Sequence, residues 1–298
     1  MKIAFPLKIF FLVLGAGAMG SAFCFPLADS GNEVRLIGTH LDEAWIAESH
    51  RSRTHPKIGI SFPDSIGIYE FGYLSLLLDD SPDLLVLGVS SPGIPWAVAQ
   101  IVESGARVER ILLLTKGLGI VGENIRMLPE IVRDSLIKSM PEISVGGVAG
   151  PCIAGELAAR RDSSVTIAST DSSLLTFLAK TIQIDYYHMH QSDDIVGTEL
   201  CAALKNFYAI GVGYAAGLSE RHRSINGAHT FNPAAAIFAQ AIGELAYLVP
   251  ILGGALRSVY GLPGVGDLYV TSQAGRNSRL GALLGSGLTF GVAKSNHM

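Results

Sequence analysis

The amino-acid sequence of 298 residues predicts an α/β protein in which a doubly wound, mostly parallel sheet precedes an all-helical C-terminal domain. Short apolar runs alternate with helix-like segments as far as about residue 190, and this alternation is typical of a parallel sheet covered by helices on both faces. Beyond the polar segment Gln191–Asp194 only helix-like patterns follow. We therefore expect one domain over residues 1–192 and a second over residues 193–298.

The N-terminal region contains a strand–turn–helix–strand pattern. The apolar run Ile9–Leu14 ends at a glycine and is typical of a strand buried on both faces. Residues 21–27 favour a helix, the polar segment Asp29–Asn32 ends it, and Glu33–Ile37 predicts a second strand. The crossover of such a βαβ unit is right-handed in nearly all cases, so both strands run parallel in one sheet.

The alternation continues along the chain. Further strands are expected at residues 83–89, 110–115, 144–149 and 164–169, and a helix at residues 95–103. In the C-terminal domain, helices are expected at residues 198–217 and 232–252. The second of these begins at Asn232-Pro233, a pair that predicts Asn232 as the N-cap and proline in the first turn.

A membrane span or a signal peptide is a second interpretation of the N-terminal region. Residues 9–28 carry no charged side chain, and their number is close to that of a membrane-spanning helix. A single span explains neither the polar stop at Asp29–Asn32 nor the strand pattern after it. The sequence therefore favours the βαβ unit, and we expect no integral membrane segment.

The composition argues against several classes of function. Charged residues make up 16% of the chain, below the roughly 25% of typical soluble domains, while 49% of the residues are hydrophobic, which argues against disorder. A net charge of −4 provides no basic surface for a nucleic acid. The cysteines Cys24, Cys152 and Cys201 lie far apart, which favours a reducing compartment, and no cluster has metal-ligand spacing.

A glycine-rich turn follows the first predicted strand. Its pattern Gly15-x-Gly17-x-x-Gly20 is the dinucleotide-binding fingerprint. The first glycine makes the tight turn, the second lets the backbone approach a pyrophosphate, and the third lets helix and strand pack closely. The N–H groups that begin the following helix then face the phosphates. In this strand–helix–strand context the turn predicts a site for NAD or NADP.

The end of the second predicted strand bears on the choice between these two cofactors. An acidic residue there would bind the ribose 2′-hydroxyl and favour NAD. Here the strand is followed by Gly38, Thr39 and His40, and the first carboxylates, Asp42 and Glu43, come later. The sequence therefore favours NADP, although no arginine is adjacent to hold a 2′-phosphate. Thr39 could donate a hydrogen bond to either cofactor, or be only a turn residue.

Two lysines occupy positions that suggest chemistry. Lys116 follows the strand at residues 110–115, at the sheet edge where open α/β folds bind ligands, although a solvated surface lysine is also possible there. Lys205 lies in the apolar middle of a predicted helix, where only Asn206 among its near neighbours is polar. Such a lysine either extends its ammonium to solvent or exchanges a proton, because desolvation disfavours the charged form.

The segment Gly264–Arg279 combines a carboxylate between glycines with an Arg-Asn pair. Asp267 could hold a substrate hydroxyl or orient a lysine. The planar guanidinium of Arg276 suits a phosphate dianion or a carboxylate. Taken alone, the segment also fits a polar connection between helices.

Six motifs in this order resemble those of the NAD(P)-dependent glycerol-3-phosphate dehydrogenases of bacteria and archaea. The motifs are Gly15–Gly20, Thr115–Gly117, Gly150–Glu156, Ala203–Asn206, Gly264–Leu268 and Gly275–Asn277. Each motif alone is unspecific, but all six in order are highly specific, and the resemblance extends from about residue 11 to about residue 288. It implies a Rossmann domain followed by a helical domain, with the active site between them. It also implies the reversible reduction of dihydroxyacetone phosphate to sn-glycerol 3-phosphate.

The resemblance assigns roles to individual residues. The catalytic positions are Lys205 as general acid/base, Lys116 in contact with cofactor and substrate, and Asp267 as a substrate-site carboxylate. The substrate-binding positions are Lys116, Gly150, Cys152, Lys205, Asp267, Gly275, Arg276 and Asn277. The cofactor-binding positions are Gly15, Ala16, Gly17, Ala18, Met19, Gly20, Thr39, Lys116, Ala154 and Arg276. No metal is required.

The resemblance further implies a cytoplasmic homodimer that supplies glycerol phosphate for phospholipid synthesis. Two departures from the family pattern leave alternatives open. Cys152 stands where the family has serine or threonine, which allows a related lysine-dependent reductase of another small oxo or hydroxy compound. The sequence after Gly291 lacks the helix or two that family members usually have, so the resemblance implies a shortened C-terminus. This allows a catalytically silent NADP-binding protein.

Overall fold

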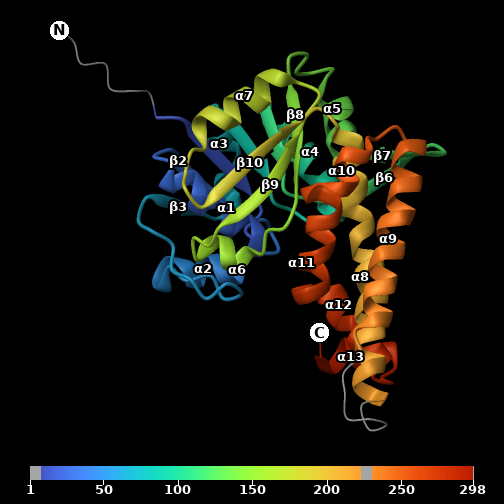
Figure 1. The fold of residues 1–298 in the computed structure, drawn as a ribbon. Coiled ribbons are helices and arrows are strands. Elements are labelled where there is room, and N and C mark those ends of the chain that lie inside the picture. Colours follow the sequence, from blue (N-terminus) through green and yellow to red (C-terminus); the bar gives the residue numbers. More distant parts are fainter. Residues whose placement is uncertain (1–7, 223–229, 298) are drawn as a thin grey trace. The chain divides into compact units, whose positions relative to one another are not determined.

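The computed structural model of the protein describes residues 8–222 and 230–297. The chain divides into two compact units, which Figure 1 shows as ribbons. Unit 1 comprises residues 1–148 and 152–195, and unit 2 comprises residues 149–151 and 196–298.

Unit 1 contains a sheet whose strands, among the described residues, lie in the order β10-β9-β8-β5-β4-β1-β2-β3. Its strands are β1 (Phe10–Leu14), β2 (Glu33–Ile37), β3 (Ile66–Tyr69), β4 (Leu84–Leu87), β5 (Arg110–Leu113), β8 (Ser144–Ala149), β9 (Ser163–Ala168) and β10 (Tyr187–Ser192). Strand β1 pairs in parallel with β2 on one side and with β4 on the other. The strand order therefore reverses at β1, where open α/β sheets bind ligands at the carboxyl ends of their strands.

Helices cover both faces of this sheet. They are α1 (Ala18–Asp29), α2 (Glu43–Ser52), α3 (Leu74–Asp79), α4 (Ile94–Ser104), α5 (Leu128–Leu136), α6 (Ala154–Ala158) and α7 (Ser172–Thr181). Phe11 and Val13 of β1 pack into the core under α1, α6 and α7, whereas Leu12 and Leu14 pack into the core under α3, α4 and α5. Because successive strand side chains point to opposite faces, an uninterrupted apolar run is what this two-sided burial requires. The predicted doubly wound sheet is confirmed.

A small antiparallel hairpin leaves the main sheet between β5 and β8. It consists of β6 (Leu118–Val121) and β7 (Asn124–Met127). The amino-acid sequence does not predict this hairpin, because its residues carry no strong alternation of apolar and polar side chains. It begins at Leu118, two residues after Lys116, and so starts at the carboxyl edge of the main sheet.

The charge-free stretch at residues 9–28 is not a continuous helix. It forms strand β1, the glycine turn and most of helix α1, and the side chains of β1 are almost completely buried. A single membrane span over this stretch is therefore excluded. Within residues 8–222 and 230–297, two other helices, Ile195–Arg221 and Asn232–Ile251, are long and apolar enough to cross a membrane by length and composition alone, which is weak support for such a role.

Unit 2 is helical over its described residues. Its helices are α8 (Ile195–His222, whose first residue belongs to unit 1), α9 (Asn232–Ile251), α10 (Leu256–Tyr260), α11 (Asp267–Ala274), α12 (Arg276–Gly285) and α13 (Phe290–His297). A π-helical turn, Leu262–Gly266, precedes α11. The predicted N-cap role of Asn232 is wrong. Phe231 precedes the helix in a near-helical conformation, so Asn232 is the first helical residue.

Glycines allow α8 and α12 to pack with their backbones in contact. Gly213 and Gly217 lie four residues apart on α8 and so share one face of that helix. A Cβ atom added at either position would lie 2.0 Å from a carbonyl oxygen of α12, that of Ser278 or Ala282. Gly281 on α12 approaches the α8 backbone equally closely. This packing holds α12, and with it the Arg-Asn pair at its start, against the helix that carries Lys205.

Candidate cofactor and substrate sites

The three fingerprint glycines of unit 1 have three different surroundings. Gly15 has φ +105°, and a Cβ atom added there would lie 2.7 Å from the backbone of Gly88. A Cβ atom at Gly20 would lie 2.1 Å from the carbonyl oxygen of Gly15. A Cβ atom at Gly17 would meet no protein atom within 4 Å. The first and third glycines therefore allow the chain to turn and pack, whereas the second leaves open space above the turn.

Helix α1 begins directly after this turn, at Ala18. Its N-cap residue is Gly17, which has no side chain to accept the first helical N–H groups, and its first turn contains no acidic residue. The positive end of the helix dipole is therefore not compensated by a side chain of α1 itself. Such a helix start attracts a phosphate or another anion.

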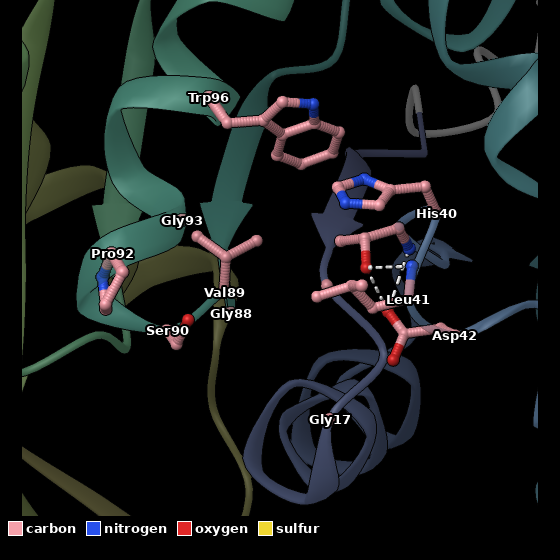
Figure 2. Close-up of a pocket in the computed structure, with 12 residues that line it drawn as sticks. Gly17, His40, Leu41, Asp42, Gly88, Val89, Ser90, Pro92, Gly93 and Trp96 are labelled. Atoms are coloured by element: carbon pink, nitrogen blue, oxygen red, sulfur yellow. Dashed lines mark hydrogen bonds between the residues drawn. The ribbon is translucent and has the colours of Figure 1, made fainter.

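A pocket of about 520 Å³ lies beside the glycine turn. It is formed by the carboxyl ends of β1, β2 and β4, and Figure 2 shows Gly17 on one side of it and Ser90 on another. Its lining residues are Gly15, Gly17, Thr39, His40, Leu41, Asp42, Gly88, Val89, Ser90, Pro92, Gly93 and Trp96. The pocket lies at the reversal of strand order, and its volume is typical of a small-molecule or cofactor site.

Aromatic rings form one side of this pocket. The imidazole of His40 lies edge-on to the indole of Trp96, with ring centroids 5.1 Å apart, and Figure 2 shows the two rings next to each other. The ring of Phe71 packs against both of them. A flat apolar group such as a nucleotide base fits against a wall of this kind.

Asp42 lies at the same pocket but directs its carboxylate at groups of the protein. One oxygen accepts hydrogen bonds from the backbone N–H and the hydroxyl of Thr39, both at 2.8 Å, and from the N–H of Ala16 at 3.4 Å. The other oxygen accepts from the indole N–H of Trp45 at 3.2 Å. Burial disfavours the charged carboxylate, but these hydrogen bonds outweigh it, and the pKa of Asp42 lies below its ordinary value.

Lys116 follows β5 in unit 1, as the sequence predicts. Its backbone carbonyl accepts a hydrogen bond of 2.9 Å from the hydroxyl of Ser91. The preceding residue, Thr115, donates its hydroxyl to the carbonyl of Val89 at 2.5 Å. Val89 and Ser90 line the pocket, so these two hydrogen bonds tie the backbone of Lys116 to the pocket rim.

Three further predicted residues lie together in unit 1. Met19, Cys152 and Ala154 are half-buried and pack against the core cluster under helix α1. Helix α6, which begins at Ala154, packs on α1. The proximity of the Cys152 thiol adds to burial in raising the pKa of Tyr187.

The predicted catalytic lysine lies in unit 2 and is paired with the predicted carboxylate. Lys205 on α8 is 8% exposed, and its ammonium donates to one carboxylate oxygen of Asp267, which is 1% exposed. The other oxygen of Asp267 accepts the backbone N–H of Gly150 at 3.2 Å, and residues 149–151 belong to unit 2. Three predicted site residues from distant parts of the sequence are therefore in contact. The carboxylate offsets the cost of burying the ammonium.

Local backbone geometry places Asp267 at this point. It is the first residue of α11 and follows the π-helical turn Leu262–Gly266 directly. Gly264 has no room for a side chain, because a Cβ atom there would lie 2.0 Å from the carbonyl oxygen of Val259. Single π-helical turns occur frequently at functional sites, where they change the direction of the side chains that follow.

The second part of the predicted substrate segment lies at the other end of α11. Gly275 connects α11 to α12, and Arg276 and Asn277 form the first turn of α12. Arg276 is exposed and Asn277 is half-buried. Because α11 has eight residues, this junction lies about 12 Å along the helix axis from Asp267. Asp267 and the Arg-Asn pair thus occupy opposite ends of a short helix.

Sequence reasoning missed the hydrogen bonding of Asp42 and the aromatic wall of His40 and Trp96. The sequence places Asp42 late after β2 for the acidic residue that binds a ribose hydroxyl, and its carboxylate folds back onto Thr39. One local signal could have indicated this contact. Asp42 lies directly before a helix and three residues after Thr39, and aspartates at such positions accept hydrogen bonds from nearby backbone N–H groups. No local pattern signalled that Trp96 faces His40.

Two sequence profiles match the chain. The profile of the N-terminal domain of NAD-dependent glycerol-3-phosphate dehydrogenases matches residues 11–175, and that of the C-terminal domain of the same enzymes matches residues 194–298. The chain belongs to the NAD-dependent glycerol-3-phosphate dehydrogenase family. The family resemblance inferred from the six motifs is thereby confirmed.

Individual members of the family are similar over most of their length. The chain is 34% identical over 281 residues to the NADP(+)-dependent glycerol-3-phosphate dehydrogenase of Archaeoglobus fulgidus. These aligned residues cover 94% of this chain and 81% of that protein. This chain is 32% identical over 278 residues to the glycerol-3-phosphate dehydrogenase (NAD(P)+) of Oceanobacillus iheyensis, covering 92% and 76% of the two chains. The crystal structure of glycerol-3-phosphate dehydrogenase from Coxiella burnetii matches with a TM-score of 0.82 at 26% identity, covering 97% of this chain and 84% of that one.

Proposed function

We propose that this protein catalyses the reversible reduction of dihydroxyacetone phosphate to sn-glycerol 3-phosphate with a nicotinamide cofactor. The contact of the buried Lys205 ammonium with Asp267, in a chain of this family, is the observation that carries the proposal. The names of the relatives support the same reaction. We assign cofactor binding to unit 1 and proton transfer to unit 2.

The pocket of unit 1 fits a dinucleotide. The open side of Gly17 and the uncapped start of α1 suit the pyrophosphate, and the wall of His40 and Trp96 suits the adenine. Ala16, Ala18, Met19 and Ala154 belong to the turn and helices next to this pocket. When bound, the nicotinamide supplies or accepts the hydride.

Lys205 transfers the proton to or from the substrate oxygen. During reduction, the C2 carbonyl oxygen of the substrate gains negative charge as the carbon accepts a hydride, and the Lys205 ammonium protonates that oxygen. During oxidation, the neutral amine takes the proton from the C2 hydroxyl. Asp267 is a positioning residue in this scheme, because its contacts with Lys205 and the Gly150 N–H fix where the ammonium lies. A donor already in place where charge develops lowers the barrier most effectively.

The phosphate of the substrate requires cations. We assign Arg276 and Asn277, at the start of α12, to this group, because a guanidinium forms paired hydrogen bonds with phosphate oxygens. We also assign Lys116, which follows β5, to cofactor and substrate binding. Cys152 takes the place of a hydroxyl donor, and a thiol is a weak donor, so we expect the backbone rather than this side chain to provide that contact.

We propose that the cofactor preference is for NADP. A free carboxylate at the end of β2 would accept the ribose 2′-hydroxyl and repel a 2′-phosphate. The carboxylate of Asp42 is instead occupied by Thr39, Ala16 and Trp45. The similarity to a relative named for NADP(+) supports the same preference.

Oxidation of NADPH at 340 nm, with and without dihydroxyacetone phosphate and repeated with NADH, tests the activity. We expect oxidation that depends on the substrate, with a higher kcat/KM for NADPH. Lys205→Ala should lower kcat by roughly two to four orders of magnitude while NADPH still raises the melting temperature. Near-normal turnover of Lys205→Ala would refute the role of Lys205.

The same assay separates two other functions. Turnover of a non-phosphorylated carbonyl compound in preference to dihydroxyacetone phosphate would replace our proposal by a related lysine-dependent reductase, for which the Cys152 substitution is the motivation. Stabilisation by NADPH without turnover of any substrate would instead indicate a nucleotide-binding protein without catalysis.

We further propose a cytoplasmic homodimer that forms through the helices of unit 2. Large apolar side chains are exposed along α9 and α10, among them Tyr247 (71%), Ile251 (63%) and Tyr260 (61%). An apolar surface of this kind is typical of an interface between subunits. Light scattering on the purified protein should give twice the monomer mass of 31.5 kDa. Tyr247→Glu should give the monomer mass, and a monomeric unmodified protein would refute the proposal.

A further inference from the structure

Two side chains from one segment of unit 1 hold the second residue of the glycine turn. The N–H of Ala16 donates to Asp42 Oδ2 at 3.4 Å, and the carbonyl of Ala16 lies 3.2 Å from Nε2 of His55. Ser21 donates a second hydrogen bond to the same carbonyl at 3.3 Å. Both backbone groups of Ala16 are therefore held in place, and Gly17, the glycine with the open side, is the next residue.

Hydrogen bonds determine which ring nitrogen of His55 carries the proton. The backbone N–H of Lys57 donates to His55 Nδ1 at 3.1 Å, so Nδ1 must be unprotonated. Nε2 then carries the hydrogen and donates it to the Ala16 carbonyl. His55 is 1% exposed, so its ring has little freedom to turn.

Trp45 joins the two side chains into one assembly. Its indole N–H donates to Asp42 Oδ1 at 3.2 Å. Its ring lies edge-on to the imidazole of His55, with centroids 4.6 Å apart. Asp42, Trp45 and His55 thus form a continuous set of contacts on the Ala16 backbone.

We propose that Asp42, Trp45 and His55 form a clamp that holds the glycine turn in its pyrophosphate-binding shape and loosens when the imidazole is protonated. The inference rests on the proposed cofactor binding by unit 1. The clamp residues are positioning residues, because they contact Ala16 and leave the open side of Gly17 to the cofactor.

Protonation loosens the clamp for a geometric reason. A second proton on the ring would sit on Nδ1, directly against the N–H of Lys57, and two donors cannot share a hydrogen bond. The protonated ring therefore loses the Lys57 hydrogen bond that orients it, although the Ala16 carbonyl itself favours the protonated ring. The charged groups that act on the imidazole are Lys57, which opposes protonation, and Asp42, which favours it.

The structure also sets the direction of the pH dependence. Burial, the largest effect, together with the Lys57 charge lowers the pKa of His55 below its ordinary value of 6.5. The clamp is therefore intact at neutral pH. Below about pH 6.5 an unfolded or loosened chain binds the proton more readily than the clamped one, so acid favours the loosened state.

Titration calorimetry with NAD+ between pH 5.5 and pH 7.5 tests the clamp. NAD+ is a suitable probe because its pyrophosphate charges do not titrate in this range. We expect the Kd of the unmodified protein to rise roughly fivefold on acidification, the equivalent of one lost hydrogen bond. Two substitutions separate the two ring contacts. The H55Q amide is long enough to place an N–H donor at the position of Nε2, next to Ala16, whereas the shorter H55N amide reaches only the position of Nδ1, next to Lys57.

We expect H55Q to bind NAD+ like the unmodified protein at pH 7.5, with no change on acidification. We expect H55N to bind about fivefold more weakly at both pH values, with a raised KM for NADPH and a kcat changed less than twofold. H50Q, at an exposed histidine of the same region, is the control and should keep the unmodified pH dependence.

The clamp is overturned if H55N binds NAD+ as tightly as the unmodified protein. It is also overturned if the affinity of H55Q falls on acidification as much as that of the unmodified protein. If neither variant folds, as judged by circular dichroism, the unmodified protein decides the question. An affinity for NAD+ that is constant from pH 5.5 to 7.5 overturns the inference. Absence of NAD+ and NADPH binding by the unmodified protein at every pH refutes the proposed function itself.

Discussion

Replacing Gly17 or Gly20 by alanine separates cofactor binding from folding at two positions three residues apart. A Cβ atom at Gly20 would lie 2.1 Å from the carbonyl oxygen of Gly15, so the backbone itself must shift. Overpacking of this kind destabilises a protein by about 3 kcal/mol. A Cβ atom at Gly17 meets nothing within 4 Å, and φ −68° is accessible to alanine. The lost N-cap preference destabilises by only about 0.5–1 kcal/mol.

The two variants should therefore behave in opposite ways. At about 2–4 °C per kcal/mol, Gly20→Ala should lower the melting temperature of the cofactor-free protein by about 6–12 °C, and Gly17→Ala by no more than about 4 °C. The Gly17→Ala methyl group occupies the space that we assign to the pyrophosphate, so the Kd for NADPH should rise about tenfold or more.

Differential scanning fluorimetry without cofactor and calorimetry with NADPH measure these two quantities. Gly291→Ala is the control, because it adds a Cβ atom in open space on the exposed helix α13 of unit 2. If Gly17→Ala binds NADPH normally, or if both turn variants lose the same stability, the division of roles among the fingerprint glycines is refuted.

Three further predictions follow from the packing and charges. Asp267→Asn leaves the Lys205 ammonium buried without its anion and should lower the free energy of unfolding in urea by about 3 kcal/mol. Adding Lys205→Met to this variant should recover part of that loss, and a lack of recovery would refute the charge argument. The unmodified protein should have a higher free energy of unfolding than Asp42→Asn above pH 5, and this difference should shrink below about pH 4, because the pKa of Asp42 is lowered from 3.8 and protonation removes its contribution. A difference that stays constant from pH 3 to 7 would contradict this. Gly213→Ala should destabilise the protein by roughly 3 kcal/mol, whereas Gly243→Ala on the exposed helix α9, where an added Cβ atom meets no atom within 4 Å, should stabilise it by about 0.5–1 kcal/mol. Similar effects of the two substitutions would refute the backbone contact of α8 and α12.

The amino-acid sequence predicts the central elements of unit 1 because their signal is local. Strands β2 and β8 have the bounds that the pattern predicts, since an apolar run bounded by polar or glycine residues needs no information from elsewhere in the chain. Edge strand β10 was missed. Its sequence Tyr187–Ser192 alternates poorly and is largely exposed on one side, so only its pairing with β9 makes it a strand.

The proposed sites divide in the same way. The glycine turn and Lys205 stand out in the sequence, because three glycines at fixed spacing and one lysine in an apolar helix are local anomalies. The partners of these residues do not stand out. Asp42 and the buried His55 have no local pattern that connects them to Ala16, which lies 39 residues before His55.

The sequence by itself determined the strands β1, β2, β4, β5, β8 and β9, the position of the dinucleotide fingerprint and the family to which the chain belongs. Only the tertiary structure decided which groups meet. Asp267 lies 62 residues from Lys205 and 117 residues from Gly150, yet one carboxylate contacts both. The physical reason is that periodicity and turn propensity act over a few residues, whereas a buried charge is satisfied by whatever partner the packed chain brings within hydrogen-bond distance.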